Sequence, residues 1–455
     1  MLYHFVGIGG IGMSALALHL KLKNGDEVYG SNLEENDRTI YLREHGIEVF
    51  ITHSEDNWKN PDRLIVSTAV NKTNPEVQKA LREGIPILKR MELLIQELKK
   101  YYSIGISGTD GKSTTTAMIF HLLSKLEEAP TSLLGAIHPD LNHGNYHLGN
   151  DRMVVEIDES DGYVKNATVN VAVLTNVRPD HLEHYGGRFE NLREAMKLFL
   201  SNAEDAICIF RDEEETWELA SSISRIRLLS FGCNRASTLR LVERKIISKK
   251  PYVQEFVVEH GYGRVKARLR VPGMYNVFNA LASCCALMAM GYPPDVISML
   301  EDFPPVKRRF NVLLEDKERR LIVIEDYAHT PREIAETLQA VKEVYDNKKL
   351  ISVFQPHRYT RLARENGNFA RVLEKSDEVH VLPLFDAYEK EIKGVNEKEI
   401  VDHLRGKNVP SHFHEDMWNV VDDLKHVNNS VVLFIGAGDI TDVAKEYVRL
   451  CRSTT

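Results

Sequence analysis

Cysteine is scarce in this sequence, and no stretch approaches the roughly 20 consecutive apolar residues that span a bilayer. The five cysteines are odd in number and lack the Cys-x-x-Cys spacing of a metal site. They therefore indicate reduced thiols, most of them buried, and not a disulfide framework. The amino-terminal residues also lack the basic start of a secretory signal. We expect a cytoplasmic protein that has no membrane partner.

An excess of positive charge is absent as well. The 455 residues include 58 Lys and Arg against 66 Asp and Glu, which gives a formal net charge of −8 at pH 7. Proteins that bind nucleic acid usually carry a basic excess, so this balance argues against a nucleic-acid partner. Apolar residues make up 43% of the chain, and its length suggests about three globular domains of roughly 150 residues each.

A glycine-rich loop at residues 105–116 is the most informative motif. Its sequence, Gly-Ile-Ser-Gly-Thr-Asp-Gly-Lys-Ser-Thr-Thr-Thr, follows a strand pattern and precedes an apolar helical pattern. Gly108 and Gly111 let the backbone curl around an anion. Lys112 adds positive charge, and Ser113 offers a hydroxyl to Mg²⁺. The strict phosphate-loop pattern has one more glycine, so a simple helix-capping turn is the alternative interpretation.

A second glycine turn, Gly-Ile-Gly-Gly-Ile-Gly-Met-Ser, occupies residues 7–14 between a short strand pattern and a helix pattern. In a dinucleotide-binding fold the next strand would end in an acidic ribose ligand, but residues 27–31 are followed by Asn32. The sequence therefore argues against NAD. A helix N-terminus recognises phosphates and not the base, so the turn can bind the diphosphate of another nucleotide.

Strand and helix patterns alternate along the whole chain, which predicts an α/β fold. Residues 1–95 predict a small doubly wound domain, a second series begins at Ser103, and a third follows the basic cluster at 307–309. The near-continuous apolar strands of the later series are typical of buried parallel sheets. Ligands gather beyond the carboxyl ends of such strands. In the third series, the residues at these ends are Asp326, His329, His357 and Arg358.

Several acidic side chains follow a predicted strand of the second series. They are Glu156, Asp158, Glu159 and Asp161. We expect them at the same sheet edge as the phosphate loop, where one or two carboxylates and the Ser113 hydroxyl would bind Mg²⁺. His181 also follows a strand and would serve a second cation or a proton, although a lone histidine is more often structural.

Two arginines, Arg358 and Arg361, follow a strand of the third series. Their spacing puts both guanidinium groups on one face of a first helical turn, where a fork of this kind suits carboxylate or phosphoryl oxygens. A solvated helix start is the alternative. The basic run at residues 307–310 also has two possible interpretations, an interdomain basic patch or a phosphate clamp.

Taken in order, these motifs resemble those of the Mur ligases. The segments that carry the resemblance are 7–14, 108–114, 156–161, 176–181, 272–276, 307–310, 326–329 and 354–361. The resemblance covers nearly the whole chain and implies three domains. They are a Rossmann-like domain at 1–95 that binds a UDP sugar, a central phosphate-loop ATPase domain with a mostly parallel sheet at 96–302, and a carboxyl-terminal Rossmann-like domain at 303–455 that binds the amino acid and closes on ATP.

Within the family, the opening glycine motif is most similar to that of members that join L-alanine to UDP-N-acetylmuramate in peptidoglycan precursor synthesis. The resemblance implies a two-step ligation. The substrate carboxylate takes the γ-phosphoryl group of ATP to become an acyl phosphate, and the amine of the amino acid then displaces phosphate. It also implies Mg²⁺, with Mn²⁺ as a substitute, and a monomer or weak homodimer.

Matching motif positions assigns roles to individual residues. Those that would bind ATP are Gly108, Thr109, Asp110, Gly111, Lys112, Ser113, Thr114, Asn276, Arg308 and Asp326. Those that would bind the UDP sugar are Gly7, Gly9, Gly10, Gly12, Met13, Ser14 and Ser31. The amino acid would contact Tyr327, His329, Arg358 and Arg361. A first Mg²⁺ would contact Ser113 and Glu156, and a second would contact His181. Catalysis would depend on Lys112, Glu156, His181, His329, Arg358 and Arg361.

The sequence departs from the family pattern at several of these motifs. Ser113 replaces threonine and keeps the hydroxyl, Thr330 replaces a second histidine, and Asn32 replaces aspartate. Asp110 stands where histidine is usual and puts an anion beside bound phosphates, which would weaken ATP binding unless it faces solvent or the metal. Tyr275 also replaces a histidine and would alter the packing of adenine.

Other functions remain open from sequence alone. A murein peptide ligase would attach a recycled tripeptide to the same UDP sugar. Folylpolyglutamate synthase shares the ATPase core but lacks the additional domain at 1–95. An NAD-dependent oxidoreductase would use the first glycine turn and leave the phosphate loop idle. A regulatory nucleotide-binding protein would bind both nucleotides and release no phosphate.

Overall fold

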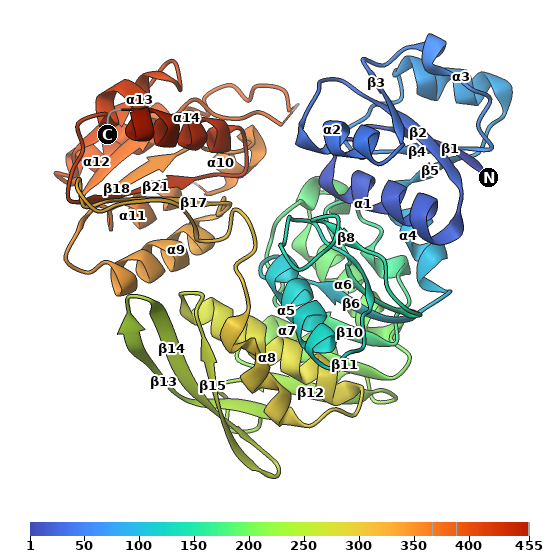
Figure 1. The fold of residues 1–455 in the computed structure, drawn as a ribbon, viewed down its shortest axis with the longest axis horizontal. Coiled ribbons are helices and arrows are strands. Elements are labelled where there is room, and N and C mark those ends of the chain that lie inside the picture. Colours follow the sequence, from blue (N-terminus) through green and yellow to red (C-terminus); the bar gives the residue numbers. More distant parts are fainter. Residues whose placement is uncertain (366, 388, 454–455) are drawn as a thin grey trace. The chain divides into compact units, whose positions relative to one another are not determined.

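The computed structural model of the chain describes residues 1–365, 367–387 and 389–453. Three sheets follow one another along the sequence, each flanked by helices (Figure 1). The chain divides into two compact units. The first comprises residues 1–245, 255–269 and 277–304, and the second comprises residues 246–254, 270–276 and 305–455.

The first sheet has five parallel strands in the order β3-β2-β1-β4-β5. Its strands are β1 (Leu2–Val6), β2 (Glu27–Asn32), β3 (Glu48–Ile51), β4 (Arg63–Val66) and β5 (Ile87–Lys89). Its helices are α1 (Ile11–His19), α2 (Asp37–Glu44), α3 (Pro75–Glu83) and α4 (Arg90–Leu98), with short helical turns at Leu20–Asn24 and Glu55–Asn57. Asn36 and Asn74 cap α2 and α3 by accepting backbone N–H bonds, which explains where these helices begin.

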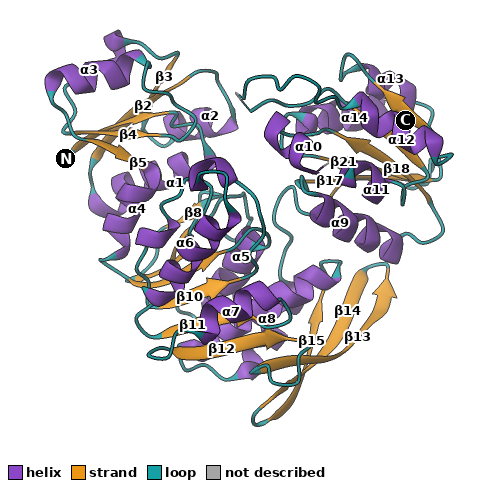
Figure 2. Ribbon diagram, turned by 180° about the vertical axis from the view of Figure 1, so that it is seen from behind, coloured by secondary structure: helices purple, strands orange, loops and turns teal. Residues whose placement is uncertain are grey.

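The second sheet has ten strands in the order β15-β14-β13-β12-β11-β10-β6-β9-β7-β8. They are β6 (Tyr102–Ser107), β7 (Thr131–Leu133), β8 (Tyr146–His147), β9 (Arg152–Glu156), β10 (Val171–Leu174), β11 (Ala206–Phe210), β12 (Arg227–Gly232), β13 (Leu239–Lys249), β14 (Tyr252–His260) and β15 (Gly263–Leu269). Its helices are α5 (Lys112–Lys125), α6 (Phe189–Ser201), α7 (Glu214–Ser221) and α8 (Met274–Ala289). Short helical turns occupy Val164–Asn166, Leu182–Tyr185 and Pro294–Asp302. Figure 2 shows β13 and β14 as the longest strands of this sheet.

The third sheet has six strands in the order β16-β17-β21-β18-β19-β20, and only the β16–β17 pair is antiparallel among its described residues. The strands are β16 (Asn311–Asp316), β17 (Leu321–Asp326), β18 (Lys349–Phe354), β19 (Glu378–Val381), β20 (Ser411–Phe413) and β21 (Ser430–Ile435). The helices are α9 (Pro331–Val344), α10 (Tyr359–Glu365), α11 (Asn368–Leu373), α12 (Lys398–Gly406), α13 (Asn419–Leu424) and α14 (Ile440–Ser453).

Buried apolar side chains hold these layers together. In the first unit one continuous core contains Phe5 and Leu16, from the elements of the first sheet and its helices. The same core contains Met153 and Phe199, from the elements of the second sheet and its helices. The first two sheets therefore pack as one body. All five cysteines are free thiols and four of them are buried, as the sequence predicts. Among the described residues, no helix combines the length and apolarity that crossing a bilayer requires.

The α/β class and the mostly parallel sheets predicted from the sequence are confirmed. The near-continuous apolar runs of the second and third series do form strands, such as β9, β17 and β21. The domain limits at residues 95 and 302 stay a prediction.

Candidate functional site

The phosphate loop connects β6 to α5 at the carboxyl end of its strand. Gly108 and Gly111 have φ angles of +129° and +84°, which side-chain residues rarely adopt. A Cβ atom on Gly108 would lie 2.2 Å from Thr175 Oγ1, and one on Gly111 would lie 2.6 Å from Asn279 Oδ1. Both positions therefore require glycine. Gly111 is the cap residue of α5 and has no side chain to occupy the first N–H groups, which suits the turn to an anion.

Lys112 is the cation of this loop. Its Nζ donates to the carbonyl oxygens of Gly108, at 2.5 Å, and Thr109, at 3.0 Å, and lies 2.9 Å from Glu159 Oε2. Burial alone would lower the pKa of Lys112, but the combined charges of Glu159, Asp158 and Glu156 and the hydrogen bond to Glu159 outweigh it and raise that pKa. Lys112 therefore stays protonated. Glu159, which is 2% exposed, makes the contact that a phosphate oxygen would make.

Asp110, the departure from the family pattern, forms an ion pair. Arg178 contacts Asp110 through one terminal nitrogen and Glu213 through the other. The backbone N–H of Asp110 donates to Asn176 Oδ1, at 2.9 Å, and that of Arg178 donates to Thr109 Oγ1, at 2.9 Å. Arg178 thus compensates the charge that Asp110 adds to the loop, and it is anchored to the loop backbone.

Ser113 and Glu156 lie together, as predicted. β6 and β9 are neighbouring strands in which Ile106 pairs with Glu156, so the glutamate stands beside the phosphate loop. Glu156 Oε1 accepts the N–H of Gly135 at 2.8 Å, and the Ser113 hydroxyl also bonds to its carboxylate. Burial nevertheless raises the pKa of Glu156. A divalent cation fits this pair, because both are hard oxygen ligands and a positive charge would offset the cost of the buried carboxylate. Thr114, 8% exposed, follows in the same turn of α5.

The remaining carboxylates form one electrostatic cluster with Glu156. Asp158 lies 3.1 Å from Arg90. Burial would raise the pKa of Asp158, but Arg90 and Lys112 outweigh burial and lower the pKa to about 2. Asp161 has the opposite outcome, since burial and the charge of Asp158 raise its pKa to about 6. The cluster thus mixes one strongly ionised carboxylate with groups that burial holds closer to neutral.

His181 reaches the same cluster. It has a left-handed backbone with φ of +51°, and it lies near Asp158, whose pKa is lowered, and near Glu159, whose pKa burial raises. Its Nε2 lies 3.6 Å from Asp180, and its Nδ1 lies 3.6 Å from Glu183. The structure therefore brings His181 among the acidic groups, where either interpretation drawn from the sequence, a cation ligand or a proton carrier, remains chemically reasonable.

The first glycine turn, at residues 7–14, connects β1 to α1. Gly7 has φ of +82°, and a Cβ atom on Gly9 would lie 2.8 Å from Asn36 Nδ2. Gly10 is the cap residue of α1, so no side chain blocks the N–H groups of the first turn. This geometry is the one expected of a diphosphate site at a helix N-terminus.

Arg90 lies against this turn. A Cβ atom on Gly12 would lie 2.8 Å from Arg90 Nη1, so a side chain at this position would push the guanidinium group away from the turn. The same guanidinium is ion-paired with Asp158. Arg90 therefore touches both the predicted UDP-sugar turn and the carboxylate cluster, a position that no motif in the sequence indicates.

Three residues predicted to contact the UDP sugar have buried side chains. Met13 is 2% exposed and packs in the core. Ser14 Oγ accepts a hydrogen bond from Asn145 Nδ2 at 2.9 Å, and Ser31 Oγ donates to Glu76 Oε2 at 2.6 Å. Ligand contacts at these positions would therefore run through backbone atoms, and their role stays a prediction.

In the second unit, Asp326 ends β17 as predicted. Its carboxylate oxygens accept the N–H groups of Phe310, at 2.7 Å, and Ala328, at 2.8 Å. Burial raises the pKa of Asp326 to about 6, against the charge of Arg309 and these two bonds. Asp326 therefore fixes the backbone on either side of the strand end.

Arg308 and Tyr327 are brought together beside Asp326. The guanidinium of Arg308 lies 4.8 Å from the ring centre of Tyr327 and donates to the carbonyl oxygens of Gly436 and Gly438. Arg308 is thus held over an aromatic face. Asn276 donates to Pro272 O at 2.6 Å within its own motif.

Tyr275 packs against the core of this unit. Burial raises the pKa of its hydroxyl well above the usual value, and the charge of Asp326 adds to the effect. A neutral phenol, not an imidazole, therefore stands near Asp326.

Glu333 is surrounded by basic side chains in the second unit. It closes the capping box of α9 with Thr330, which occupies the position of the missing histidine. Its Oε2 accepts the N–H of His329 at 3.0 Å and lies 3.3 Å from His329 Nδ1. Burial would raise the pKa of Glu333, but His329, Arg309 and Arg361 lower it to about 2. Glu333 therefore orients His329, a role that sequence analysis missed although Thr-x-x-Glu is a capping signature.

The two arginines differ from the predicted fork. α10 begins at Tyr359, and Arg358 precedes it with φ of +71°, so Arg358 is not on the helical face of Arg361. Arg361 is 2% exposed and lies 2.9 Å from His357 Nδ1. Arg358 is 27% exposed and lies 3.8 Å from Glu389. The backbone turn at Arg358 is the physical reason why helical spacing does not apply.

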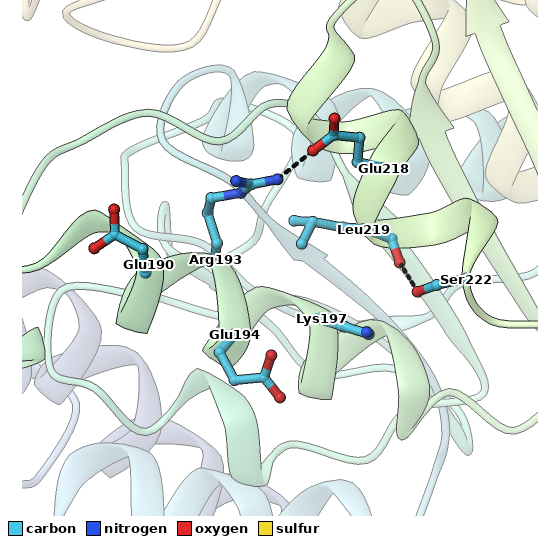
Figure 3. Close-up of a pocket in the computed structure, with 7 residues that line it drawn as sticks. All are labelled: Glu190, Arg193, Glu194, Lys197, Glu218, Leu219 and Ser222. Carbon is cyan, nitrogen blue, oxygen red and sulfur yellow. Dashed lines mark hydrogen bonds and ion pairs between the residues drawn. The ribbon is translucent and has the colours of Figure 1, made fainter.

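A surface hollow of about 310 Å³ lies between α6 and α7 (Figure 3). Its lining residues are Glu190, Arg193, Glu194, Lys197, Glu218, Leu219 and Ser222. Arg193 crosses it to pair with Glu218. No predicted site residue lines this hollow within the described part of the chain, so it does not represent the nucleotide site.

Comparison with known proteins places the whole chain in one family. Residues 2–102 match the profile described as "Mur ligase family, catalytic domain", residues 106–287 the "Mur ligase middle domain", and residues 308–438 the "Mur ligase, glutamate ligase domain".

Full-length relatives agree with these matches. The UDP-N-acetylmuramate–L-alanine ligase of Thermotoga petrophila is 40% identical over 457 residues, 100% of this chain and 97% of that protein. The ligase of the same name from Thermotoga neapolitana is 42% identical over 458 residues, 100% and 98% of the two chains. The crystal structure of the UDP-N-acetylmuramate-alanine ligase of Thermotoga maritima matches with a TM-score of 0.88 and 40% identity over 100% of both chains. A murein peptide ligase from Psychrobacter arcticus shares the fold, with a TM-score of 0.73, 18% identity and coverage of 99% and 98%.

Proposed function

Because the chain belongs to the Mur ligase family, we propose that it joins L-alanine to the lactyl carboxylate of UDP-N-acetylmuramate at the expense of ATP. The observation that carries this function is the identity of 40–42% over the full length of ligases with that activity in their names. The product would begin the peptide of a peptidoglycan precursor. The enzyme is thus an acid–amino acid ligase that forms a C–N bond.

In the first step, a carboxylate oxygen of the sugar attacks the γ-phosphorus of ATP, and the bond to the ADP oxygen breaks. Lys112 and the N–H groups of the Gly108–Thr114 loop would hold the phosphates, with Glu159 giving up its contact to Lys112. Such a step needs positioning and neutralisation more than covalent chemistry. The salt bridge of 2.9 Å between Lys112 and Glu159 supports this role, because it keeps a protonated amine at the loop.

A first Mg²⁺, or Mn²⁺ in its place, would be held by Ser113 and Glu156, and His181 would hold a second ion. When bound, these ions would neutralise phosphate charge. The burial of the Glu156 carboxylate and its bond to Ser113 support this assignment. Asp158 and Arg90 would keep the surrounding charges fixed.

In the second step, the amine nitrogen of alanine attacks the acyl carbon, phosphate leaves with the bonding electron pair, and the nitrogen loses a proton. Arg358 and Arg361 would bind the alanine carboxylate, with Tyr327 and His329 beside it. The bond from Glu333 to the backbone of His329 supports a fixed orientation of that ring. Asn276, Arg308 and Asp326 would contribute to the ATP site from the same unit.

The first glycine turn would hold the UDP diphosphate through Gly7, Gly9, Gly10 and Gly12, with Met13, Ser14 and Ser31 nearby. We further propose a cytoplasmic monomer or weak homodimer, with a UDP-sugar domain at 1–95, an ATPase domain at 96–302 and an amino-acid domain at 303–455. Neither nucleic acid nor a membrane would take part in the reaction.

The test is phosphate release from ATP and Mg²⁺ with UDP-N-acetylmuramate, comparing L-alanine, glycine, L-serine and the murein tripeptide as acceptors. We expect release that depends on both the sugar and L-alanine. Preference for the tripeptide would instead indicate a murein peptide ligase, which shares this fold at only 18% identity. Absence of sugar-dependent release would contradict ligation altogether.

A further inference from the structure

A cluster of histidines lies at the edge of the third sheet, apart from the residues assigned above. His380 on β19 pairs in register with His412 on β20, and His414 follows β20 directly. Side chains two residues apart on a strand share a face, so the three imidazoles stand on the same face of this strand pair. Their rings stack, with His380 between His412, at 5.0 Å, and His414, at 5.1 Å. His380 is 3% exposed and His414 is 6% exposed.

The contacts of His380 determine which nitrogen carries its proton. Its Nε2 lies 3.0 Å from Glu378 Oε1, and a carboxylate can only accept. Nε2 therefore carries the hydrogen, and Nδ1 presents a lone pair to His414 Nε2 at 2.9 Å. A carboxylate that holds the outer N–H of a histidine is the usual support of a metal-binding imidazole.

A third ligand is within reach. Asp423 on α13 has a side chain that is 58% exposed, and one carboxylate oxygen lies 3.9 Å from His414 Nδ1. One ligand atom from each of His380, His414 and Asp423 lies within 4.8 Å of the other two. Two nitrogens on one zinc ion, each at about 2.0–2.1 Å from it, lie roughly 3 Å apart, close to the observed separation of the histidines. Asp423 now lies beside the other His414 nitrogen, Nδ1, so its exposed side chain would have to rotate to meet an ion held between His380 Nδ1 and His414 Nε2.

We propose that His380, His414 and Asp423 bind a divalent transition-metal ion of the zinc class, with Glu378 supporting His380 from the second layer. Two imidazoles and one carboxylate favour such an ion over Mg²⁺ or Ca²⁺, which prefer oxygen ligands. The ion would tie the edge strand β20 and helix α13 to β19, and water would complete its coordination.

The test is titration of the untagged, full-length protein with Co²⁺, followed by its visible absorption bands, and competition with Zn²⁺. Excess Mg²⁺ is present throughout, because it fills oxygen sites and competes poorly for imidazole. We expect one tight site in the unaltered protein. His414→Gln and Asp423→Asn should each weaken binding by at least about tenfold. Zn²⁺ should also raise the melting temperature of the unaltered protein and not that of Asp423→Asn.

His412→Gln is the matched control, because His412 stacks on His380 from the same face but lies outside the ligand set. We expect its metal affinity to stay within about twofold of the unaltered protein. Circular dichroism checks folding, and if His414→Gln fails to fold, the exposed Asp423→Asn variant decides alone. Unchanged affinity in Asp423→Asn, or an equal loss in His412→Gln, would overturn the proposed site.

Discussion

The ion pair between Arg178 and Asp110 makes a specific prediction about ATP binding. Arg178→Met removes the cation that compensates Asp110, while its backbone bond to Thr109 can remain. The Arg178 and Asp110 side chains are only 22% and 16% exposed, so solvent would screen the charge of Asp110 poorly once it has lost its partner. A like-charge interaction over roughly 5–10 Å, at an effective dielectric constant of about 20, amounts to about 2–3 kcal/mol. We therefore expect the KM for ATP to rise by at least about tenfold.

The assay is the initial rate of phosphate release as ATP is varied, with the sugar and alanine saturating. Asp110→Asn in the Arg178→Met background removes the uncovered charge and should restore the KM to within a few-fold of the original. Glu213→Gln serves as the control for the other contact of Arg178. A KM that is unchanged in Arg178→Met, or that is not restored in the double variant, would refute the electrostatic argument.

Three further predictions concern the chemistry and the stability of the protein. Lys112→Ala should abolish turnover because the loop loses its cation, and retention of more than about a few per cent of the rate would contradict that role. Arg358→Ala should raise the KM for alanine more than that for ATP in steady-state assays, and equal effects on both would remove Arg358 from the amino-acid site. Glu97 has a pKa of about 2, because bonds from His19, Lys100 and Asn24 outweigh burial. A carboxylate whose pKa is lowered in the folded state stabilises the protein at pH values above its unfolded pKa, and this stabilisation is lost as pH falls. The free energy of unfolding in urea should therefore fall by about 3 kcal/mol between about pH 4.5 and pH 2, and this fall should be absent in Glu97→Gln.

Local sequence rules predicted the parts of the site that lie at strand ends. Ser113 and Glu156 meet because β6 and β9 are adjacent parallel strands, and parallel strands bring their carboxyl ends to one edge. Asp326 likewise ends β17 where its apolar run stops. These residues follow from hydrophobic pattern and topology alone.

Residues whose roles depend on tertiary packing escaped prediction. Arg90 opens α4 and meets Asp158, which is 68 residues further along the chain, only once the first two sheets pack together. Asn279 approaches Gly111 in the same way. Arg358 fails the helical-spacing rule because its backbone turns left-handed just before α10. A spacing rule cannot anticipate such a turn, since the conformation of Arg358 is set by its backbone bond to Phe385.

The position of Arg90 has a thermodynamic consequence. One guanidinium group lies against Gly12 and pairs with Asp158, so it contacts the first glycine turn and the carboxylate cluster at once. A nucleotide sugar that draws Arg90 toward the turn would change the field at the carboxylates, and a cation among the carboxylates would release Arg90 toward the sugar. Linkage then requires each ligand to alter the affinity of the other by the same factor. If both regions bind their proposed ligands, Arg90 would couple the two binding steps.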